Sequence, residues 1–141
     1  MQSKDLVQLA EQFGSPLYVY DAEKIQSQYN RLTKAFSKVD KLRINYANVA
    51  ILQLLKEMGA GLDTVSIQEV LLGLHAGYAP EKIFYTPNGV SLEEIEEVNA
   101  MGVQINIDNL SILEQFGAKH PNVPVCIRIN PHVMAGGNTN I

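Results

Sequence analysis

Apolar runs and helical patterns alternate along most of this chain. Each short apolar run, which predicts a buried strand, is followed after a turn by a segment whose apolar residues recur every three or four positions, which predicts a helix. We expect strands at 42–47, 62–65, 82–86, 103–107 and 125–129. We expect the intervening helices at 49–58, 67–76, 91–101 and 110–119. Glycines end the first three of these helices, as is typical of helix C-termini.

This order of elements predicts an α/β fold with a parallel sheet covered by helices. The right-handed rule for such connections leaves two topologies, an open doubly wound sheet and a (β/α)8 barrel. A dinucleotide-binding sheet is disfavoured because no G-x-G-x-x-G follows the strand at 42–47. We therefore predict that residues 41–141 form the first five strands and four helices of a (β/α)8 barrel, incomplete here and part of a longer chain.

Residues 1–40 form a separate leading segment in this interpretation. We expect a short helix at 4–13, a break at Gly14 to Pro16, a strand at 17–20, and a long helix at 22–39 with Asp21 as its N-cap. A strand placed before a barrel has no position inside it. We therefore expect the strand at 17–20 to join a second, C-terminal β-domain.

Composition and charge narrow the range of functions. The 141 residues carry a net charge of −4, which disfavours nucleic acid and an anionic membrane surface as partners. No apolar stretch suits a membrane span, and residues 1–12 lack the pattern of a signal peptide, so we expect a cytoplasmic protein. The single cysteine, Cys126, lies in an apolar run and is expected to be a buried hydrophobe. The histidines are far apart in sequence, and no metal site is expected.

Functional groups of a (β/α)8 barrel gather at the C-terminal ends of its strands. In this chain the residues at those positions are polar and mixed in charge, which suits a small polar ligand better than a lipid. They are Tyr46 and Ala47; Asp63 and Ser66; Thr86, Pro87 and Asn88; Asp108 and Asn109; and Arg128, Asn130 and His132.

Some of these residues have a simpler structural role as helix caps. Ser66 with Glu69, and Ser91 with Glu94, form the S-x-x-E pattern of a capping box. The Asp-Asn pair at 108–109 directly precedes a predicted helix and is also expected to cap it.

Asp63 and Arg128 are not explained by capping. Each lies in an apolar strand pattern, where a charged side chain needs a partner. A pair across the barrel interior and a cofactor-facing role are both open, and the two are compatible. We expect Tyr46, Asp63 and Arg128 to converge at one end of the strands, with Asp63 and Arg128 at hydrogen-bonding distance or one water apart.

Five stretches of the sequence resemble one enzyme family. They are SPLYVYD at 15–21, LRINYA at 42–47, GAGLDTVSIQEV at 59–70, TPN at 86–88 and CIRINPHV at 126–133. In these stretches the chain resembles the N-terminal part of the fold-type III pyridoxal-phosphate-dependent decarboxylases, and among them those that act on diaminopimelate. The resemblance implies an alanine-racemase-like barrel, a C-terminal β-domain, and a homodimer with a shared active site.

The resemblance also implies a reaction, the pyridoxal-phosphate-dependent decarboxylation of meso-2,6-diaminopimelate to L-lysine and carbon dioxide. It places Asp63 near the Schiff base of the cofactor and Arg128 on the cofactor's phenolic side. Tyr46 and Ala47 match the end of the strand beside the cofactor lysine, and His132 belongs to a loop that borders the substrate. A carboxynorspermidine or ornithine decarboxylase, or an alanine racemase, remains open on the same scaffold.

The chain departs from the family pattern at one point that matters for the chemistry. Family members read Y-A-x-K-A-N after the first strand, and that lysine forms the Schiff base with pyridoxal phosphate. Here Ala47 runs directly into Asn48, so the lysine and a few neighbouring residues are missing and the chain as it stands is expected to be inactive. We predict that a lysine-bearing loop belongs between Ala47 and Asn48 in the parent protein. If the junction is real, the chain is a non-catalytic pseudoenzyme or interaction module.

Overall fold

The computed structural model describes residues 2–47 and 51–129. The chain divides into two compact units, Met1–Leu42 and Arg43–Ile141. His132 and Asn48, and with them the predicted break in the chain after Ala47, lie outside the described residues.

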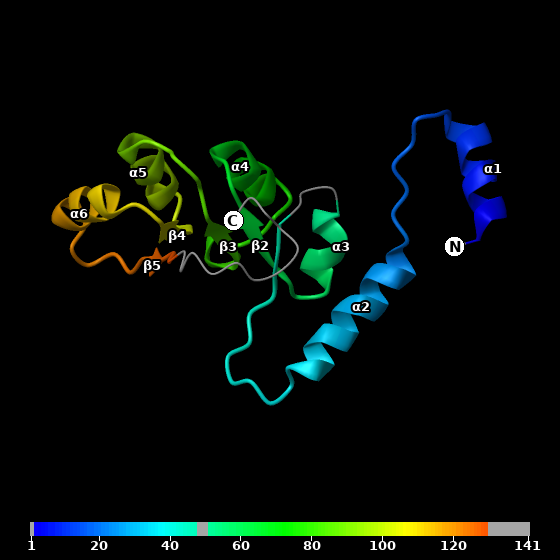
Figure 1. The fold of residues 1–141 in the computed structure, drawn as a ribbon, viewed down its shortest axis with the longest axis horizontal. Helices are drawn as coiled ribbons and strands as arrows, with labels where there is room; N and C mark the ends of the chain where they lie inside the picture. The colour runs from blue at the N-terminus through cyan, green and yellow to red at the C-terminus, as the bar shows by residue number, and fades with distance from the viewer. Residues whose placement is uncertain (1, 48–50, 130–141) are drawn as a thin grey trace. The chain divides into compact units, whose positions relative to one another are not determined.

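The first unit contains two helices, α1 (Ser3–Phe13) and α2 (Ala22–Ala35) (Figure 1). Asp21 caps α2 as predicted, since its side chain accepts a hydrogen bond of 3.0 Å from the backbone N–H of Lys24. The expected helix at 22–39 ends earlier than predicted. Beyond Phe36 the backbone bonds reach back three residues instead of four, and the chain continues as turns.

The segment at 17–20 is not a strand in this structure. Its residues have the composition of a strand, but no strand of the described part of the chain pairs with them. A strand exists only through hydrogen bonds to a neighbour, and the Tyr18 side chain is 89% exposed. The contribution of this segment to a second domain stays a prediction.

The second unit is built on a parallel sheet whose five strands follow one another in sequence order, which confirms the predicted topology (Figure 1). The strands are β1 (Asn45–Tyr46), β2 (Gly61–Thr64), β3 (Ile83–Tyr85), β4 (Gln104–Ile107) and β5 (Cys126–Ile127). The connecting elements are α3 (Leu52–Glu57), α4 (Ile67–His75), the short 3-10 helix η1 (Pro80–Lys82), α5 (Leu92–Ala100) and α6 (Leu110–Lys119).

The core lies between the sheet and its helices. Side chains on a strand alternate between the two faces of the sheet. One set is almost fully buried and packs against helix residues such as Val70 and Phe116; its strand members include Leu62, Ile83, Tyr85, Ile105 and Ile107. The alternate residues are only half-buried and form the other face of the sheet, called here the inner face: Asp63, Phe84, Gln104 and Asn106. The inner face is where a barrel would hold its ligand.

Two glycines between α3 and β2 have different roles. Gly59 has a φ of 85°, the left-handed conformation that ends a helix, as predicted. Gly61 is the first residue of β2 and not part of the helix stop. A Cβ atom there would come within 2.9 Å of the backbone oxygen of Lys82, so only glycine lets the neighbouring strand approach.

Cys126 is exposed, which corrects the prediction that it is buried. Its apolar surroundings in sequence suggested a core position. In the described residues β5 pairs only with β4, and both of its residues are exposed.

Candidate functional site

The C-terminal ends of the strands meet at one edge of the sheet, and the ladder continues past the strands themselves. The Thr86 N–H donates to Thr64 O at 2.7 Å, and the Arg128 N–H donates to Ile107 O at 2.9 Å. These bonds keep the residues just after β3 and β5 in line with the neighbouring strands. The backbones of Thr86 and Arg128 are therefore held by the geometry of the sheet.

Asp63 is the best-anchored carboxylate of this edge. It lies in β2 on the inner face, in register with Phe84 of β3. The Thr86 hydroxyl donates to Asp63 Oδ1 at 2.8 Å. This bond orients the carboxylate along the edge of the sheet and satisfies one of its acceptor positions.

The predicted direct pair between Asp63 and Arg128 is wrong for the described residues. Asp63 accepts its hydrogen bond from Thr86, and no ion pair between Asp63 and Arg128 is present there. The two residues belong to β2 and to the end of β5, three strand spacings apart, which is roughly 14 Å along a sheet. A cofactor-facing role for each stays a prediction.

Tyr46 does not converge with Asp63, which corrects the second part of that prediction. Tyr46 is in register with Leu62, whose side chain is 1% exposed and belongs to the core under the helices. Tyr46 therefore faces the helix side and Asp63 the opposite side. Ala47 directly follows β1, and continuing the register by one residue would bring it opposite Asp63 on the inner face.

Three predicted caps are confirmed. Ser66, Ser91 and Asn109 each accept hydrogen bonds from backbone N–H groups in the first turn of their helices. The glutamates, however, do not return bonds to their cap residues. Glu69 accepts from Val65 N at 2.8 Å, and Glu94 accepts from the Tyr85 hydroxyl.

Burial of Tyr85 raises its pKa, and the hydrogen bond to Glu94 and the negative charge of Glu94 raise it further. The Tyr85 hydroxyl thus stays protonated and donates to Glu94, which joins β3 to α5 on the helix side of the sheet. This contact fixes the start of α5 and with it the loop after β3.

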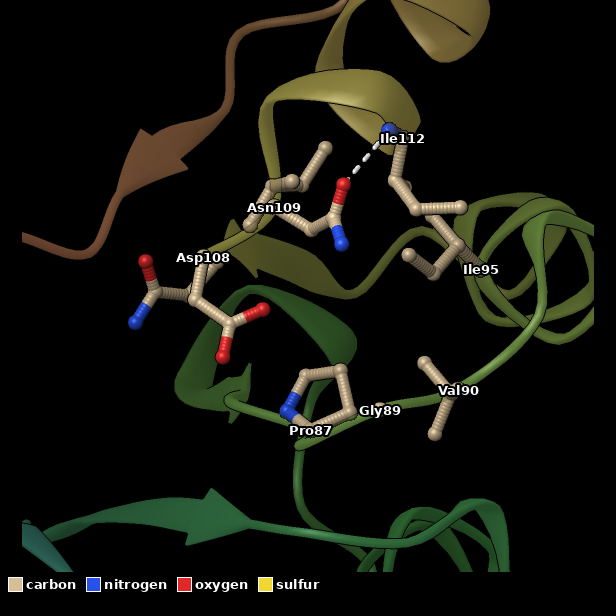
Figure 2. A pocket seen from close by; sticks show the side chains of 9 residues that line it. Pro87, Gly89, Val90, Ile95, Asp108, Asn109 and Ile112 are labelled. Atoms are coloured by element: carbon tan, nitrogen blue, oxygen red, sulfur yellow. Dashed lines mark hydrogen bonds between the residues drawn. The ribbon is translucent and has the colours of Figure 1, made fainter.

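Asp108 is not a cap, contrary to prediction. The cap of α6 is Asn109 alone, whose Oδ1 accepts from Ser111 N and Ile112 N at 2.9 and 3.2 Å. Asp108 instead lines a pocket at the ends of β3 and β4. Figure 2 shows Asp108 and Asn109 on one side of this pocket and Val90 and Ile95 on another.

The pocket encloses about 170 Å³. Its lining combines the polar ends of two strands with apolar residues from the starts of α5 and α6: Pro87, Gly89, Val90, Ile95, Asn106, Ile107, Asp108, Asn109 and Ile112. The sequence identified Pro87, Asp108 and Asn109 as edge residues, but the apolar wall was missed. Its signal was present in the apolar residues of the first turns of both helices.

Asn106 was also missed from the sequence. It lies on the inner face of β4, in register with Cys126, and its Oδ1 atom is buried without a hydrogen-bond partner among the described residues. Buried acceptors of this kind are rare, and each calls for a ligand, a water or an ion. The available signal was the single polar residue between Ile105 and Ile107.

The hydrogen bond between Thr86 and Asp63 can be tested by stability. We expect Thr86→Val to lower the free energy of unfolding by about 1–2 kcal/mol, because the half-buried carboxylate loses a donor and gains no other. Thr86→Ser, which keeps the hydroxyl, is the matched control and should lower the free energy of unfolding by less. Urea unfolding of both variants, in a double-mutant cycle with Asp63→Ala, measures the coupling. Equal stability of the Val and Ser variants would contradict this role.

Comparison with known proteins gives a consistent answer. Residues 22–141 match the family model described as "Pyridoxal-dependent decarboxylase, pyridoxal binding domain". The chain is 38% identical to diaminopimelate decarboxylase of Methanothermobacter thermautotrophicus and 32% identical to that of Escherichia coli K12, over 94% and 93% of its length. It covers 32% of each of these relatives, so it spans about a third of their length.

Solved structures agree with the sequence relatives. Diaminopimelate decarboxylase from M. jannaschii in complex with L-lysine matches with a TM-score of 0.74 at 30% identity, over 91% of this chain and 33% of that one. Lysine/ornithine decarboxylase from Vibrio vulnificus in complex with cadaverine matches with a TM-score of 0.77 at 25% identity, over 96% and 39%.

The match to the Methanothermobacter enzyme also reflects a shortening of this chain. The alignment runs over 139 positions but uses 94% of 141 residues, about 133, so about six aligned positions have no residue here. The segment predicted to be missing after Ala47 is of this size.

The residues at the strand edge fit a pyridoxal group only in part. The carboxylate of Asp63 and the unpartnered oxygen of Asn106 offer acceptors on the inner face. No amine is offered, because residues 42–55 and 120–141 contain no lysine. Lys56 donates to Ala76 O at 2.8 Å, at the C-terminal end of α4 and so at the opposite edge of the sheet. The residues of the second unit at this edge therefore offer no amine for covalent attachment of the cofactor.

Among the described residues no helix is long and apolar enough to cross a membrane. The same part of the chain contains no cluster of three or more metal-ligating side chains.

Proposed function

We propose that this chain, which belongs to the pyridoxal-dependent decarboxylases through their pyridoxal-binding domain, is part of an enzyme that converts meso-2,6-diaminopimelate to L-lysine and carbon dioxide. The observation that supports the substrate is the agreement of diaminopimelate decarboxylases from several organisms, 32–38% identical over most of the chain. Because the chain spans a third of these relatives, the activity is proposed for the parent protein.

Pyridoxal phosphate, when bound, supplies an electron sink that lets the α-carboxylate leave as carbon dioxide. The chain's own contribution is the scaffold and the polar edge. Thr86 holds the Asp63 carboxylate in one orientation, and the sheet ladder holds the backbone of Arg128. The chain provides no amine at this edge, so we do not propose catalysis by the chain as it stands.

A second candidate is a decarboxylase of another basic amino acid. The similarity to lysine/ornithine decarboxylase at 25–26% identity supports it, and the scaffold is shared with carboxynorspermidine decarboxylase and alanine racemase in the resemblance described above. All of these candidates act on a small amino acid. They differ in the chemical group at the end of the substrate far from the α-carbon. We favour diaminopimelate because the relatives with the higher sequence identities are named diaminopimelate decarboxylases.

For the parent protein we further propose a cytoplasmic homodimer with an active site shared between subunits, and no nucleic-acid or membrane partner. The family resemblance supports the dimer, and the net charge of −4 supports the absence of nucleic-acid binding. Size-exclusion chromatography with light scattering on the parent protein tests the oligomeric state.

The decisive experiment begins with the gene. The sequence across codons 47 and 48 shows whether a lysine-bearing segment belongs there, and the parent protein so defined is assayed for L-lysine and carbon dioxide. We expect diaminopimelate to be consumed in preference to L-ornithine. Preferred turnover of ornithine would transfer the proposal to the second candidate. A direct Ala47–Asn48 junction in an inactive protein would establish the pseudoenzyme.

A further inference from the structure

The unpartnered oxygen of Asn106 indicates a second ligand contact on the inner face. Ile105 and Ile107 are 1% and 2% exposed in the core under the helices, so Asn106, between them, faces the other way. Its Oδ1 atom is buried without a partner among the described residues, while the residue as a whole is only half-buried and lines the pocket at the ends of β3 and β4. The acceptor is thus unsatisfied in a residue that borders this pocket.

Thr86 lies next to Asn106 on the neighbouring strand. Tyr85 and Ile105 are in register, and Thr86 and Asn106 are the residues that follow them. The single Thr86 hydroxyl proton is used by Asp63 Oδ1 at 2.8 Å, with Thr64 O as a weaker alternative at 3.3 Å. The hydroxyl therefore has no proton to give to Asn106, and its oxygen remains an acceptor.

The two oxygens suit one particular chemical group. The backbones of neighbouring strands are roughly 4.8 Å apart, so two side chains in register on one face can contact the same small group. Two acceptors that share one tetrahedral ammonium group at about 2.9 Å each are separated by about 4.7 Å, which is similar to the strand spacing. The nearby Asp63 carboxylate adds negative charge through Thr86, which favours a cation over a neutral donor.

We propose that Asn106 Oδ1 and Thr86 Oγ1 together bind a protonated primary amine of the bound small molecule, with Asp63 as the positioning residue that orients the Thr86 hydroxyl. This inference deepens the proposed function, because an amino-acid substrate with an amino group at its far end supplies such an amine. It does not depend on the cofactor or on the absent lysine.

The test uses the 141-residue chain and 1,5-diaminopentane as the probe. Calorimetry measures its affinity, and NMR follows the side-chain amide of Asn106. We expect Asn106→Leu, similar in size but without the acceptor, to weaken binding by about tenfold or more. Asn106→Asp adds a negative charge and should tighten binding about two- to fivefold. Gln104→Leu is the control on the same face of the same strand, because the Gln104 amide already donates to Pro124 O.

A stability measurement separates the binding role from a structural one. Removing an unsatisfied buried acceptor should leave the thermal midpoint of Asn106→Leu unchanged or raise it. A clear fall would mean that Oδ1 has a protein partner in solution, and the proposal would be overturned. It is also overturned if the diamine fails to bind, if Asn106→Leu binds it as the unchanged chain does, or if Asn106→Asp weakens binding.

These outcomes are independent of the proposed function. Diamine binding that requires Asn106, in a chain whose parent protein has no decarboxylase activity, would keep the amine site and reject the function. Decarboxylation by the parent protein, without diamine binding to this chain, would reject this inference alone.

Discussion

The Ala47→Lys variant is expected to capture pyridoxal phosphate covalently at a single site, whereas the unchanged chain is not. Ala47 directly follows β1, and continuing the register of β1 and β2 by one residue would bring it opposite Asp63 on the inner face. An amine there would stand at the edge where the chain otherwise offers only acceptors. Holding an amine and an aldehyde together raises their effective concentration by orders of magnitude, so we expect adduct at position 47 in about tenfold excess over any surface lysine.

The measurement is borohydride reduction after addition of one equivalent of pyridoxal phosphate, followed by peptide mapping. Gln53→Lys, on the exposed side of α3, is the matched control for general lysine reactivity. Labelling of Gln53→Lys equal to that of Ala47→Lys would show that the inner face has no affinity for the cofactor. A single-site adduct in the unchanged chain would contradict the assignment of the missing lysine.

The topology could be predicted from the sequence because the alternation of strand and helix patterns leaves few solutions. The predicted bounds of α6 agree with the structure, since Asn109 marks its start. Four of the five predicted strands are longer than the observed ones; β1, for example, is confined to Asn45–Tyr46 within the run 42–47, whereas β2 has the predicted length and begins one residue earlier. Apolar composition extends beyond the residues that pair with a neighbouring strand, and pairing alone defines the strand.

The candidate site was predicted less well than the fold. Asp63 was found because a carboxylate in an apolar strand needs a partner, but the partner depends on register, which composition does not contain. Thr86, at the end of the adjacent strand, is that partner, and Arg128 is three strands away. Tyr46 was assigned to the wrong face because one residue of register exchanges the two faces of a strand.

Phe116→Ala in α6 should lower the free energy of unfolding by about 3–5 kcal/mol. Phe116 is 1% exposed and packs in the core between the sheet and its helices. Its removal leaves a cavity that the surrounding strands and helices cannot fill without moving. Domains of this size are stable by about 5–15 kcal/mol, so the loss is a large part of the total.

Leu110→Ala on the same helix is the control, because Leu110 is 75% exposed and should change the free energy of unfolding by no more than about 0.5 kcal/mol. The two variants are compared by urea unfolding, with both curves fitted to the same dependence of the free energy of unfolding on urea concentration. Similar midpoints for both would mean that α6 is not packed on the sheet as described. The substitution should also affect the pocket, because α6 begins directly after Asn109, which lines the pocket together with Asp108. We therefore expect Phe116→Ala to weaken diamine binding although Asn106 and Thr86 are unchanged.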